Sequence, residues 1–287
     1  MVWWPKVQQN PIITLTSDFG LDDPFVGMMK GTIHSISSKV RIVDITHGIL
    51  AHDVIQAALV IQSSYSHFPK GSIHVVVVDP GVGSARHPLL AITEKGYFVG
   101  PDYGVFSAIY KNCDQIEFIK LTTSEYFQHP ISQTFHGRDI FGPVAAWLSQ
   151  GLDPKKLGQF MTKPVKLPLP SPRIIPGTDK VEGTILYSDR FGNILTNIPY
   201  TEFKQSFCKR DFRLVINGHL IDKMYPSYTA AKQKEIFAIW GSFGLLEIAC
   251  YQESAASVLN VKPYDNFEIK INAVSYTHLT LPTSDLV

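Results

Sequence analysis

The chain has 287 residues, of which 45% are hydrophobic and 18% are charged, and its formal net charge is +1. This composition excludes an intrinsically disordered protein, and the balanced charge argues against binding to nucleic acid or anionic membranes. No run approaches the ~20 apolar residues of a membrane span, and the opening MVWWPKVQQN lacks the apolar segment of a secretory signal. Three scattered cysteines, Cys113, Cys208 and Cys250, suit neither a disulfide framework nor a zinc cage. We therefore expect a globular protein of the reducing cytoplasm.

The first half of the chain alternates apolar, strand-like runs with amphipathic, helix-like stretches. These patterns predict strands over 12–16, 40–45, 73–78 and 97–99, and helices over 22–35, 53–64 and 140–149. The run 73–78 is apolar at nearly every position, as in a strand that is covered on both faces of its sheet. Alternation of this kind is typical of an α/β domain with a mostly parallel sheet, which we place at residues 10–163.

A proline-rich segment then divides the chain, and the pattern changes after it. Five prolines between positions 163 and 176 predict a stiff, extended linker over 164–178. Short strand-like runs separated by turn residues follow, at 181–187, 193–197, 212–216, 236–240, 245–249 and 267–271. They predict a small all-β, barrel-like domain over 179–273.

The last residues, 274–287, are set apart from the fold. The run VSYTHLTLPT at 274–283 looks like the in-frame translation of a transposon sequencing adapter. We therefore expect this tail to be an artefact of sequencing that replaces the natural C-terminus.

Three predicted strands of the first domain end in an acid that is followed closely by glycine. These acids are Asp18 in TSDFG, Asp79 in VVDPGVGS and Asp102 in VGPDYG. One such acid alone is usually a turn residue or a helix cap. Because ligands of open α/β sheets bind beyond the carboxyl ends of strands, three acids at one edge predict a polar pocket. The loops match neither the Rossmann nor the P-loop glycine pattern, which disfavours those phosphate sites.

Two further residues have side chains that suit water activation beside Asp79. Arg86 follows that acid by seven residues across a glycine-rich turn, and His136 precedes a predicted helix. An Asp–Arg pair near a histidine is suited to holding and deprotonating a water molecule, although a solvated arginine and a capping histidine are the plainer alternatives. A serine nucleophile is unsupported because GxSxG is absent. Metal ligation is disfavoured because no HExxH or comparable spacing occurs among the candidate ligands His47, His52, Asp53, Asp79 and His136.

Seven motifs in order resemble one enzyme family, from about Ile12 to Ile271. They are TSDFG, VDITHGI, VVVVDPGVGS with Arg86, VGPDYGV, TFHGRDIF, DRFGNILTNI and GSFGLLEIA. The chain thereby resembles the S-adenosyl-L-methionine (SAM) hydroxide adenosyltransferases, adenosine-forming hydrolases that are related to fluorinases and chlorinases. The resemblance implies an N-terminal α/β domain, a C-terminal β-barrel and a homotrimer with active sites between neighbouring subunits. It implies displacement of L-methionine from the ribose C5′ carbon of SAM by water, without a metal or another cofactor.

The resemblance also implies the roles of individual residues. The catalytic set falls on Asp79, Arg86 and His136, which hold and deprotonate the water. The halogenating branch usually has an uncharged residue in place of Asp79, and fluorinases carry an N-domain insertion that this chain lacks, so the resemblance favours hydrolysis. The implied substrate-binding residues are Asp18, Asp23, Phe135, Asn193, Tyr228, Ser242 and Glu247.

Among the substrate-binding residues, Asp18 is expected to bind both ribose hydroxyls, and Glu247 suits the methionine ammonium. Asn193 is expected to contact the ligand from the C-terminal domain, and Ser242 to meet its methionine or adenine portion. Tyr228 and Phe135 are candidates for stacking on adenine, with core packing as the alternative.

Asp23 is a further candidate for the methionine end, with charge in the first turn of a helix as the alternative. One departure is Gly241, where the family often has asparagine before the serine. The competing functions are a halide-dependent adenosyl transferase and a non-catalytic nucleoside-binding protein.

Overall fold

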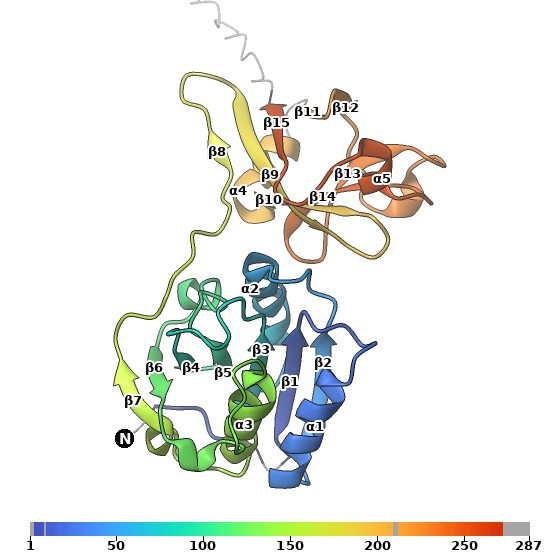
Figure 1. Cartoon of the computed structure of the whole chain (residues 1–287). Coiled ribbons are helices and arrows are strands. Elements are labelled where there is room, and N and C mark those ends of the chain that lie inside the picture. The colour runs from blue at the N-terminus through green and yellow to red at the C-terminus, as the bar shows by residue number, and fades with distance from the viewer. Residues whose placement is uncertain (1–2, 9, 209–211, 272–287) are drawn as a thin grey trace, which may run out of the picture. The chain divides into compact units, whose positions relative to one another are not determined.

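The structure is a computed structural model that describes residues 3–8, 10–208 and 212–271 (Figure 1). The chain divides into two compact units, Met1–Leu169 and Pro170–Val287. The predicted tail at 274–287 lies outside the described residues. Within the described part of the chain, no helix is long and apolar enough to cross a membrane.

A seven-stranded sheet forms the centre of the N-terminal unit. Its strands are β1 (Ile12–Ser17), β2 (Arg41–Thr46), β3 (Ser72–Val77), β4 (Pro88–Thr93), β5 (Gly96–Pro101), β6 (Ile116–Leu121) and β7 (Gly158–Met161). They lie in the order β2-β1-β3-β5-β4-β6-β7, parallel from β2 to β5 and antiparallel from β5 to β7. The predicted α/β class is confirmed. The sheet is mixed because β4, β6 and β7, which the apolar patterns did not predict, pair antiparallel.

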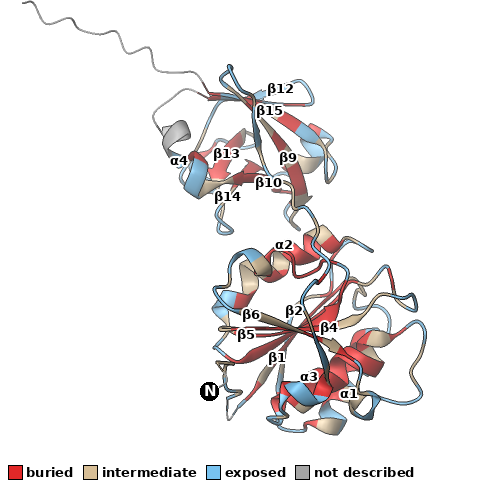
Figure 2. Cartoon of the chain, turned by 90° about the vertical axis from the view of Figure 1, so that its left-hand side faces the viewer, coloured by how far each residue is buried: buried red, intermediate tan, exposed pale blue. Residues whose placement is uncertain are grey.

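Helices cover both faces of this sheet. They are α1 (Phe25–Ile36), α2 (Val54–Ser64) and α3 (Gly142–Ser149), with a π-helical turn at Gly137–Phe141 and 3₁₀ turns at Tyr65–His67, Ile109–Lys111, Ser124–Tyr126 and Pro154–Leu157. Figure 2 shows α1 and α3 on one face and α2 on the other. Every residue of β3 is buried, as its apolar run predicts for a strand that is covered on both faces.

The strand register places the predicted chemistry at one edge of the sheet. Strands β1 and β3 are parallel neighbours, with Ser17 opposite Val77. The loops that follow them therefore begin side by side, and these loops carry Asp18 and Asp79.

The C-terminal unit is an antiparallel, barrel-like sheet, as the second half of the sequence predicts. Its strands are β8 (Arg173–Ile174), β9 (Lys180–Ser188), β10 (Ile194–Pro199), β11 (Phe212–Ile216), β12 (His219–Ile221), β13 (Ile236–Trp240), β14 (Leu245–Cys250) and β15 (Asn266–Ile271). The helices are α4 (Tyr200–Cys208) and α5 (Ala255–Leu259), with a 3₁₀ turn at Tyr228–Ala230. The strand order is β12-β11-β15-β9-β10-β14-β13, with β8 beside β9. Ala238 of β13 hydrogen-bonds the backbone of Lys223 and Tyr225, just beyond β12, which nearly closes the sheet.

The predicted linker is partly hydrogen-bonded to other segments of the chain. The backbone N–H of Val165 donates to Asp102 and that of Leu167 donates to Ser107, each over 2.8 Å. Further along, Arg173 and Ile174 pair with β9. The first part of the proline-rich segment is therefore held by the N-terminal unit, and β8 by the C-terminal sheet.

Candidate active site

A cavity of about 280 Å³ opens at the edge of the N-terminal sheet where β1 and β3 end. Its lining includes Asp18, His52, Asp79, Phe135 and His136. Asp102, which the strand-end pattern grouped with Asp18 and Asp79, is not among the described residues that line it. Its buried carboxylate instead accepts the N–H of Val165. The expectation of one pocket shared by three acids is therefore wrong for Asp102, because the proline-rich segment lies against it.

Asp79, in the cavity wall, and Arg86 form a buried ion pair. Their side chains are 6% and 4% exposed. Arg86 Nε donates to Asp79 Oδ1 over 2.9 Å, and its Nη2 donates to Oδ2, so the fork is bidentate. The other nitrogen, Nη1, is buried and has no hydrogen-bond partner among the described residues. The pair therefore leaves one guanidinium nitrogen without a hydrogen-bond partner among the described residues.

His136 completes this cluster through its Nδ1 atom, which lies 2.6 Å from Arg86 Nη2. A guanidinium only donates hydrogen bonds, so Nδ1 is the acceptor and the neutral ring carries its proton on Nε2. Burial lowers the pKa of His136 below its ordinary 6.5, and the positive charge of Arg86 lowers it further, against the opposing effect of Asp79. Both observations assign a neutral His136 at pH 7.

Tight glycine packing brings the two loops of this cluster together. Gly83 has φ +75°, and a Cβ atom there would lie 2.5 Å from the backbone oxygen of Gln133. The turn after Asp79 thus closes directly against the loop that leads to His136. A side chain at Gly83 would separate Arg86 from His136, since the two loops could not approach as closely.

The loop after β1 is fixed by contacts with the segment after β2. Asp18 Oδ2 accepts the backbone N–H of His52 over 2.8 Å, and the hydroxyl of Ser17 lies 2.7 Å from Nδ1 of His47. Asp18 thereby presents its carboxylate to the cavity. Asp23 is exposed and is not one of the described residues that line the cavity, so the structure does not bring it to this site.

Aromatic rings form an apolar wall of the cavity. Phe135 packs edge-to-face against Phe19 and Phe25, with ring centroids 5.7 and 5.3 Å apart. Phe135 is 8% exposed and belongs to the hydrophobic core, yet it also lines the cavity. The two expectations for this residue, core packing and contact with a ligand ring, are therefore compatible.

The candidate metal ligands do not form a cluster. His47 contacts Ser17 and Asp44, Asp53 caps α2 by accepting the N–H of Gln56, and His136 faces Arg86. Among the residues that the structure describes, no group of three or more His, Cys, Asp or Glu side chains is placed to hold a metal ion.

The C-terminal unit contains a second cavity, of about 570 Å³. Asn193 and Tyr228 line it, together with Asp189 and Phe191, which the sequence analysis did not select. Asp189 accepts two bonds from Asn193, from its backbone N–H and its side-chain amide, each over 2.9 Å. The DRFGN motif that holds all three residues was the available signal, and only its asparagine was assigned a role.

Glu247 lies beside this cavity, bound to a residue of its wall. It is 5% exposed, and its Oε2 accepts the hydroxyl of Tyr228 over 3.0 Å. Burial raises the pKa of Glu247, and burial together with that carboxylate raises the pKa of Tyr228 to about 12. A Cβ atom on Gly241 would lie 1.7 Å from Glu247 Oε1. Glycine at position 241, where the family often has asparagine, thus leaves room for this carboxylate. Ser242 is exposed and is not among the described residues of the cavity wall.

Comparison with known proteins identifies the family. The N-terminal domain model of the SAM hydroxide adenosyltransferases matches residues 13–158, and the C-terminal domain model matches residues 183–268. The chain belongs to the SAM hydroxide adenosyltransferase family. The motifs of the sequence predicted this family, and the prediction is confirmed.

Two named relatives and a solved structure are similar to this chain over most of its length. An (R)-S-adenosyl-L-methionine hydrolase of Methanocaldococcus jannaschii is 34% identical over 90% of this chain and 95% of its own. A fluorinase of Nocardia brasiliensis is 24% identical over 92% of this chain and 98% of its own. The crystal structure of an uncharacterized conserved protein from Thermotoga maritima superposes with a TM-score of 0.83 at 33% identity, over 90% of this chain and 99% of that one.

Proposed function

We propose that this protein hydrolyses SAM to adenosine and L-methionine. The observation that carries the proposal is the buried cluster of Asp79, Arg86 and His136 at the wall of the N-terminal cavity. Relatives named (R)-S-adenosyl-L-methionine hydrolase, up to 34% identical over most of the chain, support the same reaction.

The chemistry needs an oriented nucleophile rather than a strong acid. The sulfonium of SAM is already a good leaving group, so water must be held in line with the C5′–S bond. The water oxygen forms a bond to C5′, the C5′–S bond breaks, and its electron pair stays on sulfur as the neutral thioether of methionine. Because bulk water is a very weak acid, its conjugate base needs nearby positive charge or hydrogen-bond donors.

The cluster supplies these groups without a metal. Arg86 brings the positive charge, and its unpartnered Nη1 suits an oxygen ligand. The single lone pair of His136 Nδ1 is engaged by Arg86, whereas each carboxylate oxygen of Asp79 keeps a further acceptor site. We therefore infer that Asp79 accepts the proton of the water and that neutral His136 orients Arg86.

The remaining residues suit the other parts of the substrate. Asp18, at the same cavity, is assigned to the ribose hydroxyls, and Phe135 to an apolar part of the nucleoside. In the C-terminal unit, Asn193 and Tyr228 are assigned to ligand contacts and Glu247 to the methionine ammonium, since a buried carboxylate favours a cationic partner.

The deciding experiment is incubation of purified protein with SAM, followed by chromatography with and without chloride or fluoride. Adenosine and methionine in both cases are the expected products. A 5′-halogenated nucleoside that forms only with halide would instead favour the adenosyl transferase to which the fluorinase relatives point. Binding of SAM without any turnover would leave a nucleoside-binding protein.

We also propose, on the family resemblance, a homotrimer in which the C-terminal unit of one subunit completes the N-terminal cavity of the next. A closed ring satisfies every such site at once. Light scattering is expected to give about three times the 32.1 kDa of the chain. Mixing inactive Asp79→Asn and Glu247→Ala chains is expected to restore partial activity, because some interfaces then pair two intact halves. A fully active monomer, or no rescue after verified subunit mixing, would contradict this assembly.

A further inference from the structure

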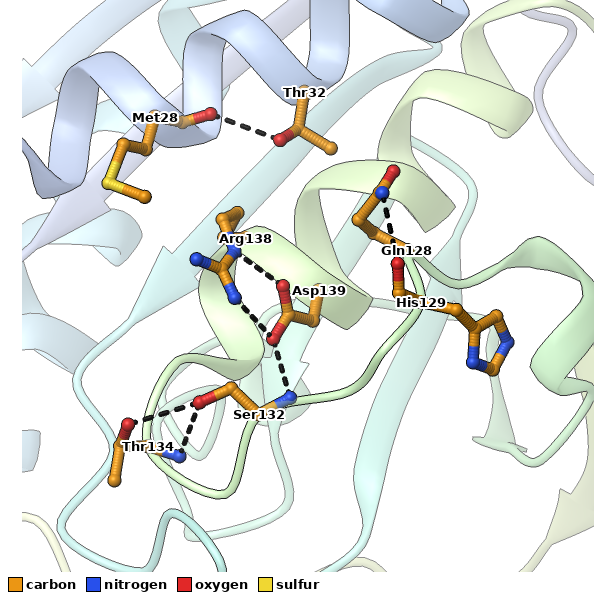
Figure 3. Close-up of polar contacts among 8 residues, drawn as sticks. All are labelled: Met28, Thr32, Gln128, His129, Ser132, Thr134, Arg138 and Asp139. Carbon is orange, nitrogen blue, oxygen red and sulfur yellow. Dashed lines mark hydrogen bonds and ion pairs between the residues drawn. The ribbon is translucent and has the colours of Figure 1, made fainter.

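A buried carboxylate, that of Asp139, lies three residues after His136 and is not among the described residues that line the cavity. The side chain of Asp139 is 0% exposed. Its Oδ1 accepts from Arg138 Nε over 2.5 Å, and its Oδ2 accepts from Arg138 Nη2 over 3.0 Å and from the backbone N–H of Ser132 over 2.8 Å (Figure 3). A buried charge with three donors aimed at it is a built feature, since an unpaired carboxylate would be costly at this depth.

The ion pair lies within an unusual turn of helix. Consecutive residues of a regular helix point in different directions and do not face each other. Arg138 and Asp139 lie in the π-helical turn Gly137–Phe141, which starts directly after His136 and widens the helix. Two parallel hydrogen bonds between these neighbours therefore lock the turn at the point where it leaves His136.

Each partner of Asp139 also contacts a residue of the cavity wall. The Arg138 guanidinium lies 5.1 Å from the ring centre of Phe135, on which it packs as a cation on an aromatic face. Ser132 accepts the backbone N–H of Thr134 on its hydroxyl over 3.0 Å. The backbone of Ser132 also hydrogen-bonds His136, and this contact and the charge of Asp139 both act to raise the pKa of that histidine.

We propose that Asp139, together with Arg138, is a positioning residue of this active site. It holds the segment from Ser132 to His136 so that Nδ1 of His136 meets Arg86 and Phe135 forms the cavity wall. This role rests on the proposed SAM hydrolysis, and Asp139 itself does not touch the substrate.

The test is Asp139→Asn, which preserves shape but cannot preserve the contacts. All three groups that contact the carboxylate of Asp139 donate hydrogen bonds to it. The NH₂ group of an asparagine would have to face at least one of these donors, and that hydrogen bond would be lost. We expect kcat to fall about 10- to 100-fold, as for a misplaced catalytic group, with a much smaller change in KM. Arg138→Lys keeps the charge but not the two parallel bonds, and is expected to lower kcat in the same direction by less.

A second measurement reads the position of His136 without any substrate. In ¹⁵N-labelled protein, the imidazole resonances, assigned with a His136→Gln variant, are expected to move in both variants. Glu182→Gln is the matched control, because it removes one carboxylate charge from the exposed Arg173–Glu182 pair of the other unit. It is expected to change neither kcat nor the resonances.

The two measurements separate the possible failures. Absence of SAM turnover in the wild-type protein would defeat the proposed function, while the resonances would still test the positioning. Unchanged resonances in folded Asp139→Asn, or moved resonances with an unchanged kcat, would overturn the role of Asp139. Should Asp139→Asn fail to fold, Arg138→Lys decides by the same two criteria, since Arg138 is 28% exposed and tolerates substitution better.

Discussion

Replacing Asp79 by asparagine removes one charge from the centre of the site and almost nothing else. Both oxygens of this carboxylate accept hydrogen bonds from Arg86, one from Nε and one from Nη2. An asparagine of the same shape offers one acceptor and one donor, so a donor must face the guanidinium. The guanidinium is then left buried, charged and without a counter-ion.

The depth of the pair sets the size of the effect on stability. With side chains 6% and 4% exposed, the loss of one partner is expected to cost about 3–5 kcal/mol of unfolding free energy. The same change at Glu182, in a pair whose side chains are 72% and 41% exposed, should cost no more than about 1 kcal/mol. Turnover in Asp79→Asn should fall about 100-fold or more, the usual scale for a lost proton acceptor.

Three measurements test this reasoning. Denaturant unfolding gives the free energies for Asp79→Asn and for the Glu182→Gln control, chromatography of adenosine gives kcat, and calorimetry gives adenosine affinity. Adenosine binding should be largely retained, because Asp18 and Phe135 are unchanged. A folded Asp79→Asn protein with near-wild-type kcat would refute the assignment of Asp79 to the activated water.

Three other predictions follow from the same geometry. The pKa of His136 in the folded protein is lowered, so its ring should stay neutral at pH 6.5 and above, and kcat should not change with its protonation there. A pH–rate profile should show kcat falling only as the pH drops below 6.5 through that lowered pKa, where the ring becomes protonated and can no longer accept from Arg86. Gly241→Ala should raise KM for SAM about 10-fold by displacing Glu247 from Tyr228, as for a lost hydrogen bond to a charged group. Gly27→Ala is the matched control, because a Cβ atom there meets no atom within 4 Å. An unchanged KM in Gly241→Ala would count against Glu247 as a ligand. Activity should survive treatment with EDTA, and loss of activity that zinc or magnesium restores would return the histidines to consideration as ligands.

The parts of the site that lie close together in the chain could be predicted from the sequence. Asp79 and Arg86 are seven residues apart across a glycine-rich turn, so their pairing follows from a short loop. Strand ends marked by an acid and a glycine predicted where Asp18 and Asp79 lie along their strands. The barrel-like second unit was predicted from short strands with turn residues between them.

Other features depend on contacts between distant segments. Periodicity does not specify the order of strands in a sheet, so only the register of β1 beside β3 brings Asp18 to Asp79. Asp102 ends a strand in the same way, yet it accepts the N–H of Val165 from the proline-rich segment. An acid at the end of a strand thus has different roles at different positions, because its role depends on the segment of the chain that packs against it.

The sequence by itself determined the family, the two-part architecture and the residue types of the candidate site, since motifs, periodicity and turn residues are local properties of the chain. Only the tertiary structure decided the chemical state of that site. His136 lies fifty residues beyond Arg86, and its neutral form and tautomer follow from burial and from a guanidinium that can only donate. The need for glycine at 241 follows likewise from the carboxylate of Glu247, which occupies the space that a side chain would fill.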